Sequence, residues 1–222
     1  MKKFELTAEY VTNVFDTKLF RIKALVAFGN VEEGELGGFV EKESNLDNDG
    51  NAWVSGNAWV SGNARVSGNA WVSGNAWVSG NARVSGNAWV SGNAQVYGNA
   101  QVYGDAQVYG DAQVYGNAQV YGNARVYGDA QVYGNAQVYG DLDYAVVGGF
   151  GSAQRTTTFF RQKDGTVGVR CGCFYGTLDE FRAKVKGTYK DSKYAQEYLM
   201  IADLMKLHFA GGSNGTEDGE NQ

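Results

Sequence analysis

Small apolar residues alternate with polar or aromatic residues through the middle of the chain, where a six-residue unit repeats without insertion from Gly50 to Gly140. The unit reads GNAWVS or GNARVS at first, then G(N/D)AQVY or GNARVY, in fifteen consecutive copies. Alternation along a short strand puts alanine and valine on one side and the variable residues on the other. Glycine followed by Asn or Asp can turn a corner, since both residue types tolerate a positive φ. The pattern therefore predicts short strands joined by tight corners.

A longer period is superimposed on the six-residue one. The residue that follows each alanine runs Trp, Trp, Arg and then repeats that order, so the same side chain returns after eighteen residues. Three six-residue sides make one turn of a triangular coil, and stacked coils bury the valines in the middle. We therefore expect a mainly β protein whose central part is a parallel β-helix of triangular section.

The outward residues fall into three columns, one for each face of this prism. A second column runs beside each of them, serine in the first coils and tyrosine from Tyr97 onward. These columns are either ladders that stabilise the sheet surface or a contact surface for a second copy or a foreign protein. The candidate interface residues are Trp53, Trp71 and Trp89 on one face, Trp59 and Trp77 on the next, Arg65 and Arg83 on the third, and the tyrosines Tyr97, Tyr103 and Tyr109.

The two ends of the chain depart from the repeat. Residues 1–35 read as short strands and predict an N-terminal β cap. The segment 36–40 fits the repeat when Leu36 is placed eighteen residues before Val54, so the β-helix is expected to span residues 36–146 with an imperfect first coil. The residues around 148–151 are rich in glycine and predict a linker.

A small α+β module is expected over residues 147–211. Asp164 and Gly165 lie between two strand-like runs, which is typical of a β-hairpin. Thr177 and Glu180 have the spacing of a capping box and predict a helix, and a second helix is expected to run from residue 191 or 192 to His208, ending at residues 211–212. Residues 212–222 are polar and acidic, and they predict a disordered tail.

Composition limits the possible partners and the cellular compartment of the protein. The net charge is −5 and the repeat is nearly neutral, so the sequence predicts no basic patch that could bind nucleic acid. The chain shows no secretory signal and no apolar run that could span a membrane, so no membrane partner is expected. Two closely spaced cysteines and no others favour a reducing cytoplasm.

The sequence contains few residues that could catalyse a reaction or bind a metal ion. Acyl transfer on this fold uses a histidine as general base, and zinc hydration chemistry uses three histidines. The chain has a single histidine, His208, which lies outside the repeat. Cys171 and Cys173 could supply half of a metal site, but packing of both thiols against the helices is the favoured interpretation. We therefore expect no catalytic residue, no metal and no cofactor.

Several stretches resemble a known family. The repeat, in which an aliphatic residue such as Val60 is followed four places on by a small residue such as Ala64, resembles the hexapeptide-repeat left-handed β-helix proteins. The segments 20–25, 28–31 and 36–41 resemble the opening of such proteins in bacteriophages and prophages, including the YdcK-type proteins that carry a transferase label. This resemblance covers residues 18–146, and the CGCFYGTLDEF stretch resembles the C-terminal module of the phage versions. It implies a left-handed coil and homotrimers, and it carries over no catalytic residue.

Together these features predict a non-enzymatic interaction protein of phage or prophage type. A rigid, trimeric prism would present its side-chain ladders and its C-terminal module to a protein partner, such as a host factor. Two alternatives stay open at this point. One is an acyltransferase-like or small-ligand-binding protein with a site between subunits, and the other is a component of a virion or filament.

Overall fold

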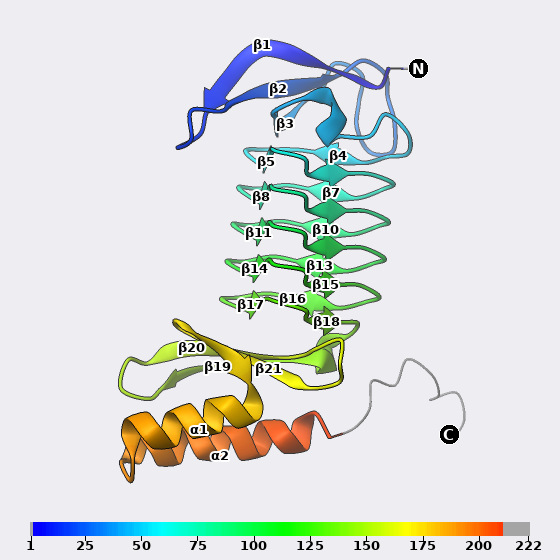
Figure 1. Cartoon of the computed structure of the whole chain (residues 1–222). Coiled ribbons are helices and arrows are strands. Elements are labelled where there is room, and N and C mark those ends of the chain that lie inside the picture. The colour runs from blue at the N-terminus through cyan, green and yellow to red at the C-terminus, as the bar shows by residue number, and fades with distance from the viewer. Residues whose placement is uncertain (1, 211–222) are drawn as a thin grey trace, which may run out of the picture.

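The computed structural model describes residues 2–210 as a triangular prism with a β cap at one end and an α+β module at the other (Figure 1). The expected helix end at 211–212 and the tail 212–222 lie outside the described residues. The cap contains β1 (Phe4–Thr12), β2 (Lys18–Ala24) and β3 (Leu36–Val40), followed by the 3-10 turn Glu43–Asn45. After the prism come a second 3-10 turn (Asp141–Asp143), β19 (Tyr144–Phe150), β20 (Arg155–Arg161), β21 (Val167–Cys171), β22 (Phe174–Thr177), α1 (Leu178–Tyr189) and α2 (Lys193–His208).

Fifteen two-residue strands build the prism, each of them a variable residue followed by valine. They form three parallel sheets, one for each face. The first sheet holds β4 (Trp53–Val54), β7 (Trp71–Val72), β10 (Trp89–Val90), β13 (Gln107–Val108) and β16 (Arg125–Val126). The second holds β5 (Trp59–Val60), β8 (Trp77–Val78), β11 (Gln95–Val96), β14 (Gln113–Val114) and β17 (Gln131–Val132). The third holds β6 (Arg65–Val66), β9 (Arg83–Val84), β12 (Gln101–Val102), β15 (Gln119–Val120) and β18 (Gln137–Val138).

The interior confirms the predicted coil. Pairing joins residues eighteen apart, as between Trp71 and Trp89, so identical side chains stack on each face. The alanines and valines of the repeat are at most 1% exposed, and they form one continuous core. The β-solenoid with its eighteen-residue coils was therefore predictable from the alternation and the two periods alone.

Glycine alone makes the corners. The repeat glycines from Gly50 to Gly134 have φ between 64° and 73°, whereas no Asn or Asp of the repeat has a positive φ. A Cβ placed on Gly86 would lie 2.9 Å from the backbone nitrogen of Gly104 in the next coil. The asparagines instead form ladders, as where Asn69 donates its side-chain N–H to Asn87 at 3.0 Å. The expectation that Asn shares the left-handed conformation is therefore wrong.

The cap joins the prism in a register that differs from the expected one. β3 lies parallel to β5 with Val40 opposite Val60, and Leu46 bridges Val66, so the offset is twenty residues in both places. Leu46 occupies a valine position, yet it precedes Val54 by eight residues instead of six. The longer corner between them accounts for the two extra residues. The predicted pairing of Leu36 with Val54 is therefore wrong.

The C-terminal module contains more sheet than the sequence indicates. Residues 148–150 belong to β19, which pairs with β20 through a register shift between Val147 and Phe150, so the predicted linker is wrong. Gly149 absorbs the irregularity with φ of 82°. The hairpin around residues 164–165 and both helix starts are confirmed, because Thr177 accepts from the backbone N–H of Glu180 and Ser192 caps α2.

Both edges of the prism are covered. At one end, Lys3 donates its ammonium group to the carbonyl oxygen of Ala52 at 3.0 Å, and β3 pairs with the first coil. At the other end, the backbone N–H of Gln131 donates to Thr158 Oγ1 at 3.0 Å. Arg161 Nε donates to Asp143 Oδ1, also at 3.0 Å, across the junction with the module. Covered edges offer no free strand for end-to-end pairing.

Candidate functional site

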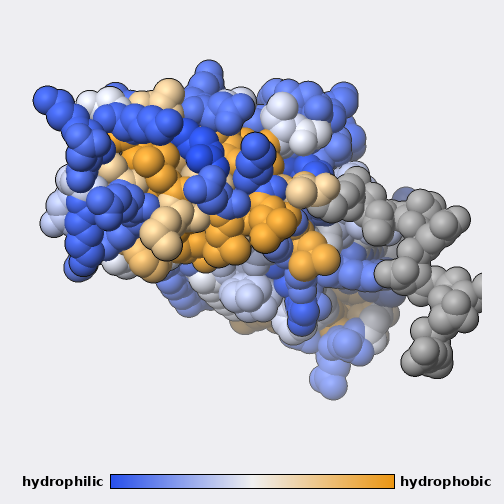
Figure 2. All heavy atoms as spheres, turned by 90° about the horizontal axis from the view of Figure 1, so that it is seen from below, coloured by the Kyte–Doolittle hydropathy of each residue, from blue (hydrophilic) through white to orange (hydrophobic). Residues whose placement is uncertain are grey.

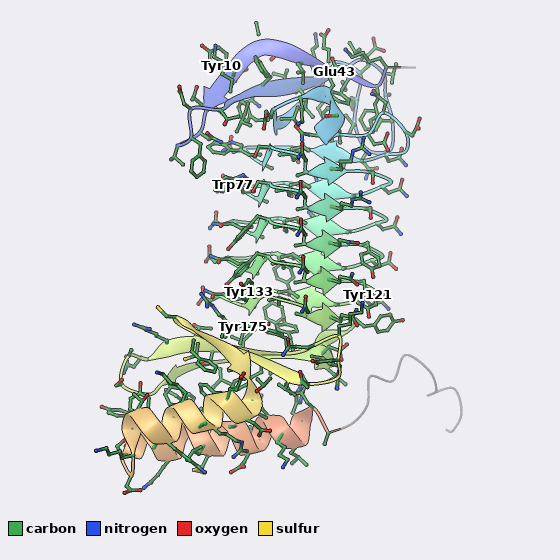
Figure 3. All side chains as sticks on the ribbon, in the orientation of Figure 1. Tyr10, Glu43, Trp77, Tyr121, Tyr133 and Tyr175 are labelled. Carbon is green, nitrogen blue, oxygen red and sulfur yellow. The ribbon has the colours of Figure 1, made fainter. Side chains whose placement is uncertain are left out.

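One face of the prism lies in a recess. The hairpin β1–β2 and the module both project past the strands β5, β8, β11, β14 and β17 on the same side, so this face is bounded at both ends (Figure 1). We call it the recessed face and define it by its outward residues Trp59, Trp77, Gln95, Gln113 and Gln131. Trp77 lies on the same side of the prism as Tyr10 of the hairpin, whereas Tyr121 lies on the opposite side (Figure 3).

The hairpin forms the upper wall of the recess. Glu9, Val11 and Arg21 line a hollow of about 650 Å³ together with the first residues of the recessed face. Arg21 donates to Glu9 at 2.8 Å and to the carbonyl oxygen of Gly37 at 2.8 Å. The two charges of this wall therefore satisfy each other, and the hollow offers mainly aromatic and amide groups to a ligand.

The two tryptophans of the recessed face contact each other. Trp59 and Trp77 meet edge to face with ring centroids 6.4 Å apart, and both are half-buried. The indole N–H of Trp77 is buried and has no hydrogen-bond partner among residues 2–210. The buried indole N–H of Trp53 on the neighbouring face likewise has no partner among residues 2–210, so this feature does not by itself distinguish the two faces.

The module forms the lower wall of the recess through a column of tyrosines. Tyr97, Tyr115 and Tyr133 stack with centroids 4.8 and 4.4 Å apart, and Tyr175 of β22 meets Tyr133 edge to face at 4.7 Å (Figure 3). Arg170 donates to Gln131 at 3.2 Å and lies over the ring of Tyr133. Burial raises the pKa of Tyr97 and of Tyr115, so these phenols are neutral at ordinary pH. The wall is polar and carries the guanidinium group of Arg170.

The other tryptophan face differs. Trp71 and Trp89 donate their indole N–H groups to Ser55 and Ser73, each at 3.1 Å. Trp53 is fully buried, because Phe28 of the cap packs edge to face on it with centroids 5.4 Å apart. The prediction that Trp53 is an exposed interface residue is therefore wrong, since the cap covers the first coil. Trp89 is 50% exposed and is the most accessible tryptophan.

The remaining candidates lie on separate faces. Arg65 and Arg83 are exposed on the third face and pair in register. Tyr103 and Tyr109 each begin a stacked pair, with Tyr121 and Tyr127 respectively, at 5.1 and 5.4 Å. Of the ten predicted interface residues, the recess therefore brings together only Trp59, Trp77 and Tyr97. The wall residues Glu9, Arg21, Arg170 and Tyr175 were missed, because nothing in a repeat indicates which face its two ends overhang.

The cysteines and the histidine do not meet in a metal site. Cys171 lies 3.9 Å from the hydroxyl of Tyr198, Cys173 is exposed, and His208 is exposed at the end of α2 beside Phe209. Within residues 2–210, no three His, Cys, Asp or Glu side chains gather closely enough to hold a metal ion.

The module adds a second apolar surface. Met200, Leu204 and Leu207 of α2 are between 57% and 74% exposed, and an apolar patch is visible on this end of the molecule (Figure 2). Neither helix within residues 2–210 has the length and apolar character needed to cross a membrane.

The repeat itself has known relatives. A family model described as the YdcK β-solenoid repeat matches residues 58–74, 64–80, 76–92, 94–110 and 118–134. The prism is a β-solenoid, and its matched coils are similar to the YdcK repeat. Each YdcK match falls within the stacked coils, so it identifies the scaffold rather than the cap, the module or the recess. No curated protein matches the chain.

Proposed function

We propose that this YdcK-type repeat protein is a non-enzymatic scaffold that binds a protein partner in the recess. The observation that carries the proposal is the placement of the half-buried Trp59 and Trp77 between two walls, beside a hollow of about 650 Å³. Tryptophan is among the residues that contribute most to protein–protein binding when it lies in a pocket away from water. A rigid prism holds such a surface at little cost in conformational entropy on binding.

The recess defines the chemistry of the partner. In the upper wall Glu9 and Arg21 pair with each other, whereas Arg170 of the lower wall bonds the neutral amide of Gln131 and keeps its positive charge. Five strands at a spacing of about 4.8 Å make the face roughly 19 Å tall, which is wider than the roughly 10–12 Å of one helix. The expected partner segment is therefore a helix with apolar side chains for the tryptophans and amide groups for the glutamine column.

We place this partner in the bacterial host cell and the chain itself in a phage or prophage, with the cytoplasm as the place of action. The support is the resemblance of the cap and the module to phage hexapeptide-repeat proteins. Affinity purification of the tagged chain from bacterial cells, followed by lysine cross-linking and mass spectrometry, tests the proposal. Cross-links should form from Lys18 of the hairpin and Lys163 beside the lower wall, and not from Lys206 of α2. Cross-links centred on Lys206 would contradict binding in the recess.

A second proposal is self-association as a homotrimer. Trp89 favours it, because this half-exposed ring borders a hollow lined by Ser91, Gln107 and Tyr109 on a face other than the recessed one. Light scattering should give a trimer for the wild type and a monomer for Trp89→Ser. A trimer that persists in Trp89→Ser and dissociates in Leu204→Ser would assign the contact to the apolar surface of α2 instead.

The two other hypotheses have less support. Filament growth needs a free strand at each end, and β3 and β20 cover the ends of the prism. Catalysis between subunits would be indicated if acyl-coenzyme A raised the melting temperature of the oligomer but not of the Trp89→Ser monomer, and that result would overturn the scaffold proposal.

A further inference from the structure

The third face of the prism carries two arginines without counter-ions. Arg65 and Arg83 lie opposite each other on the parallel strands β6 and β9, and neither guanidinium group makes a hydrogen bond, ion pair or ring contact with any residue of 2–210. Strands in register are about 4.8 Å apart, and like charges placed directly opposite destabilise a sheet. This pair therefore needs an explanation other than stability.

The repeat offers two comparisons for this pair. Arg125 is the third arginine at the same position of the unit, and it forms a two-pronged ion pair with Asp141, with a shortest contact of 2.6 Å. In the column of Arg65 and Arg83 itself, the later coils carry Gln101, Gln119 and Gln137, which avoid the repulsion. The chain thus uses both a paired arginine and a neutral residue elsewhere, but places two unpaired arginines here.

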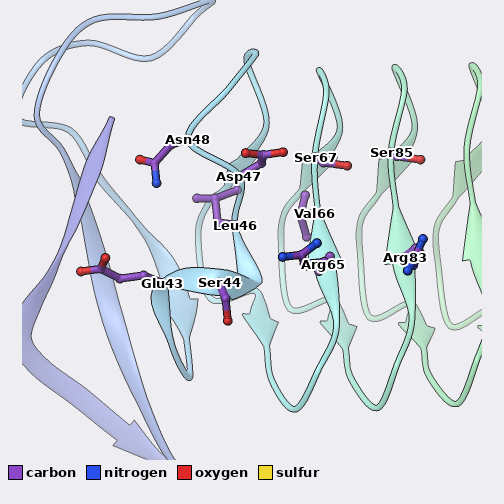
Figure 4. Close-up of a pocket in the computed structure, with 10 residues that line it drawn as sticks. All are labelled: Glu43, Ser44, Leu46, Asp47, Asn48, Arg65, Val66, Ser67, Arg83 and Ser85. Atoms are coloured by element: carbon purple, nitrogen blue, oxygen red, sulfur yellow. The ribbon is translucent and has the colours of Figure 1, made fainter. Parts of the chain in front are cut away.

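A pocket surrounds the pair. The segment 43–48 stands beside the two arginines and encloses a space of about 410 Å³ with them (Figure 4). Ser67 and Ser85 line it, and their hydroxyls have no hydrogen-bond partner among the described residues, unlike Ser55 and Ser73 on the tryptophan face. Free hydroxyl donors beside two guanidinium forks are the groups that bind an oxyanion.

The acidic residues of this pocket are partly engaged already. Glu43 forms an ion pair with Lys2 at 2.6 Å, and one oxygen of Asp47 accepts from the backbone N–H of Asp49 at 3.1 Å. Asn48 uses its side-chain oxygen to accept from the backbone N–H of Lys3 and keeps its amide N–H groups free. The pocket therefore has a cationic side at the arginines and a side toward Asp47 that can accept hydroxyl donors.

We propose that this pocket binds a small phosphate monoester, with the phosphoryl group on Arg65 and Arg83 and its hydroxyl-bearing part toward Asp47. Two guanidinium groups match the double charge of a phosphate monoester, whereas a carboxylate needs only one. This site is separate from the recess, because it lies on a different sheet of the prism. The phosphate site therefore occupies a surface that the proposed protein partner does not contact.

Titration of the full-length protein with inorganic phosphate and with glycerol phosphate, at ionic strength matched with sodium chloride, tests the site. Binding is followed by calorimetry and by the NMR signals of the arginine Nε–H groups. Wild type should bind both probes, glycerol phosphate more tightly, and Arg65→Gln/Arg83→Gln should lose about tenfold or more in affinity, the loss expected for charge-assisted hydrogen bonds. Lys206→Gln is the control, because it removes one charge from an exposed position outside the pocket.

The double variant should fold, because glutamine occupies the same column in the next coil. In chloride alone it should melt at the same temperature as wild type or higher, since the repulsion is gone. Equal phosphate binding by wild type and the double variant, or no phosphate binding by wild type beyond the chloride control, would overturn the proposal. Equal affinities of wild type for the two probes would remove the assigned role of Asp47.

Discussion

The two tryptophan faces are built from the same six-residue unit, yet the structure gives them different environments. On one face Trp53 is buried by the cap, and Trp71 and Trp89 are tied to serines of the preceding coil. On the recessed face Trp59 and Trp77 meet edge to face, and the Trp77 indole N–H has no serine partner of the kind that Trp71 and Trp89 have. The same local sequence therefore has different environments on the two faces. The cap covers the first coil of one face, whereas the hairpin and the module form walls at the two ends of the other.

The difference separates stability from binding. The tryptophans of the first face stabilise the chain itself, because Trp53 is buried and Trp71 and Trp89 donate hydrogen bonds to serines. The recessed face keeps its tryptophans half-buried between two walls, where a partner can cover them. The predictions below test this division, starting with the largest expected effect.

Trp53→Ser should destabilise the protein strongly. The ring is fully buried against Phe28, so its loss leaves a cavity and should lower the free energy of unfolding by about 3–5 kcal/mol. Chemical denaturation monitored by circular dichroism measures the change. Trp89→Ser, two coils along the same column, should cost only about 1 kcal/mol because that ring is half-exposed. Equal costs for the two variants would show that the cap does not seal the first coil.

Ser55→Ala should have a smaller effect. It removes the acceptor of the Trp71 indole N–H and should cost about 0.5–1.5 kcal/mol, as for a typical hydrogen bond. Ser61→Ala is the matched change on the recessed face, where the Trp77 indole N–H makes no such bond, and it should be nearly neutral. If both serine variants lost the same stability in thermal denaturation, the proposed contrast in hydrogen bonding would be wrong.

The tyrosine column at the lower wall should make the fold sensitive to alkali. Burial raises the pKa of Tyr97 and Tyr115 above the ordinary value of about 10, so folding favours the neutral phenols. Their contribution to stability is therefore complete below that ordinary value and is lost as the pH rises through the raised values. Phenolate absorbance and circular dichroism, recorded together during alkaline titration, measure both events. Removal of Tyr97 by Tyr97→Phe should reduce the late-titrating absorbance, and an unchanged titration would contradict the assignment.

Deletion of one complete coil, residues 68–85, should leave a folded protein with a shorter prism. The inward residues are identical from coil to coil, so the coils on either side of the deletion can stack in register. Circular dichroism should still show a β protein that unfolds cooperatively. The shortened recess contains one tryptophan instead of two, so partner binding should weaken while folding persists. An unfolded product would show that the coils are not interchangeable.

The sequence was sufficient to predict the prism, because alternation and two fixed periods leave one arrangement for the alanines and valines. It was also sufficient for the hairpin around Asp164 and for the start of α1 at Thr177, where local turn and capping chemistry decide the structure. The cap register was missed because one corner is longer by two residues, and β19 was missed because Gly149 can serve either in a linker or in a strand irregularity.

The candidate site was only partly predictable. Trp59 and Trp77 could be found as outward residues, but their enclosure depends on Arg21 and Arg170, which lie far from them in sequence. The burial of Trp53 likewise depends on Phe28 of the cap. Such contacts between segments distant in the chain leave no period and no motif.

Binding of the captured partner to two matched double variants tests the central claim most directly. Trp59→Ser/Trp77→Ser and Trp71→Ser/Trp89→Ser make the same substitution in the same unit on neighbouring faces. Affinity is measured by calorimetry with the partner recovered from host cells, after circular dichroism has shown that both variants are folded. The recessed-face variant should lose about tenfold or more in affinity, and the other should bind like wild type. Wild-type binding by Trp59→Ser/Trp77→Ser, or loss of binding by Trp71→Ser/Trp89→Ser alone, would contradict the assignment of the recess as the binding site.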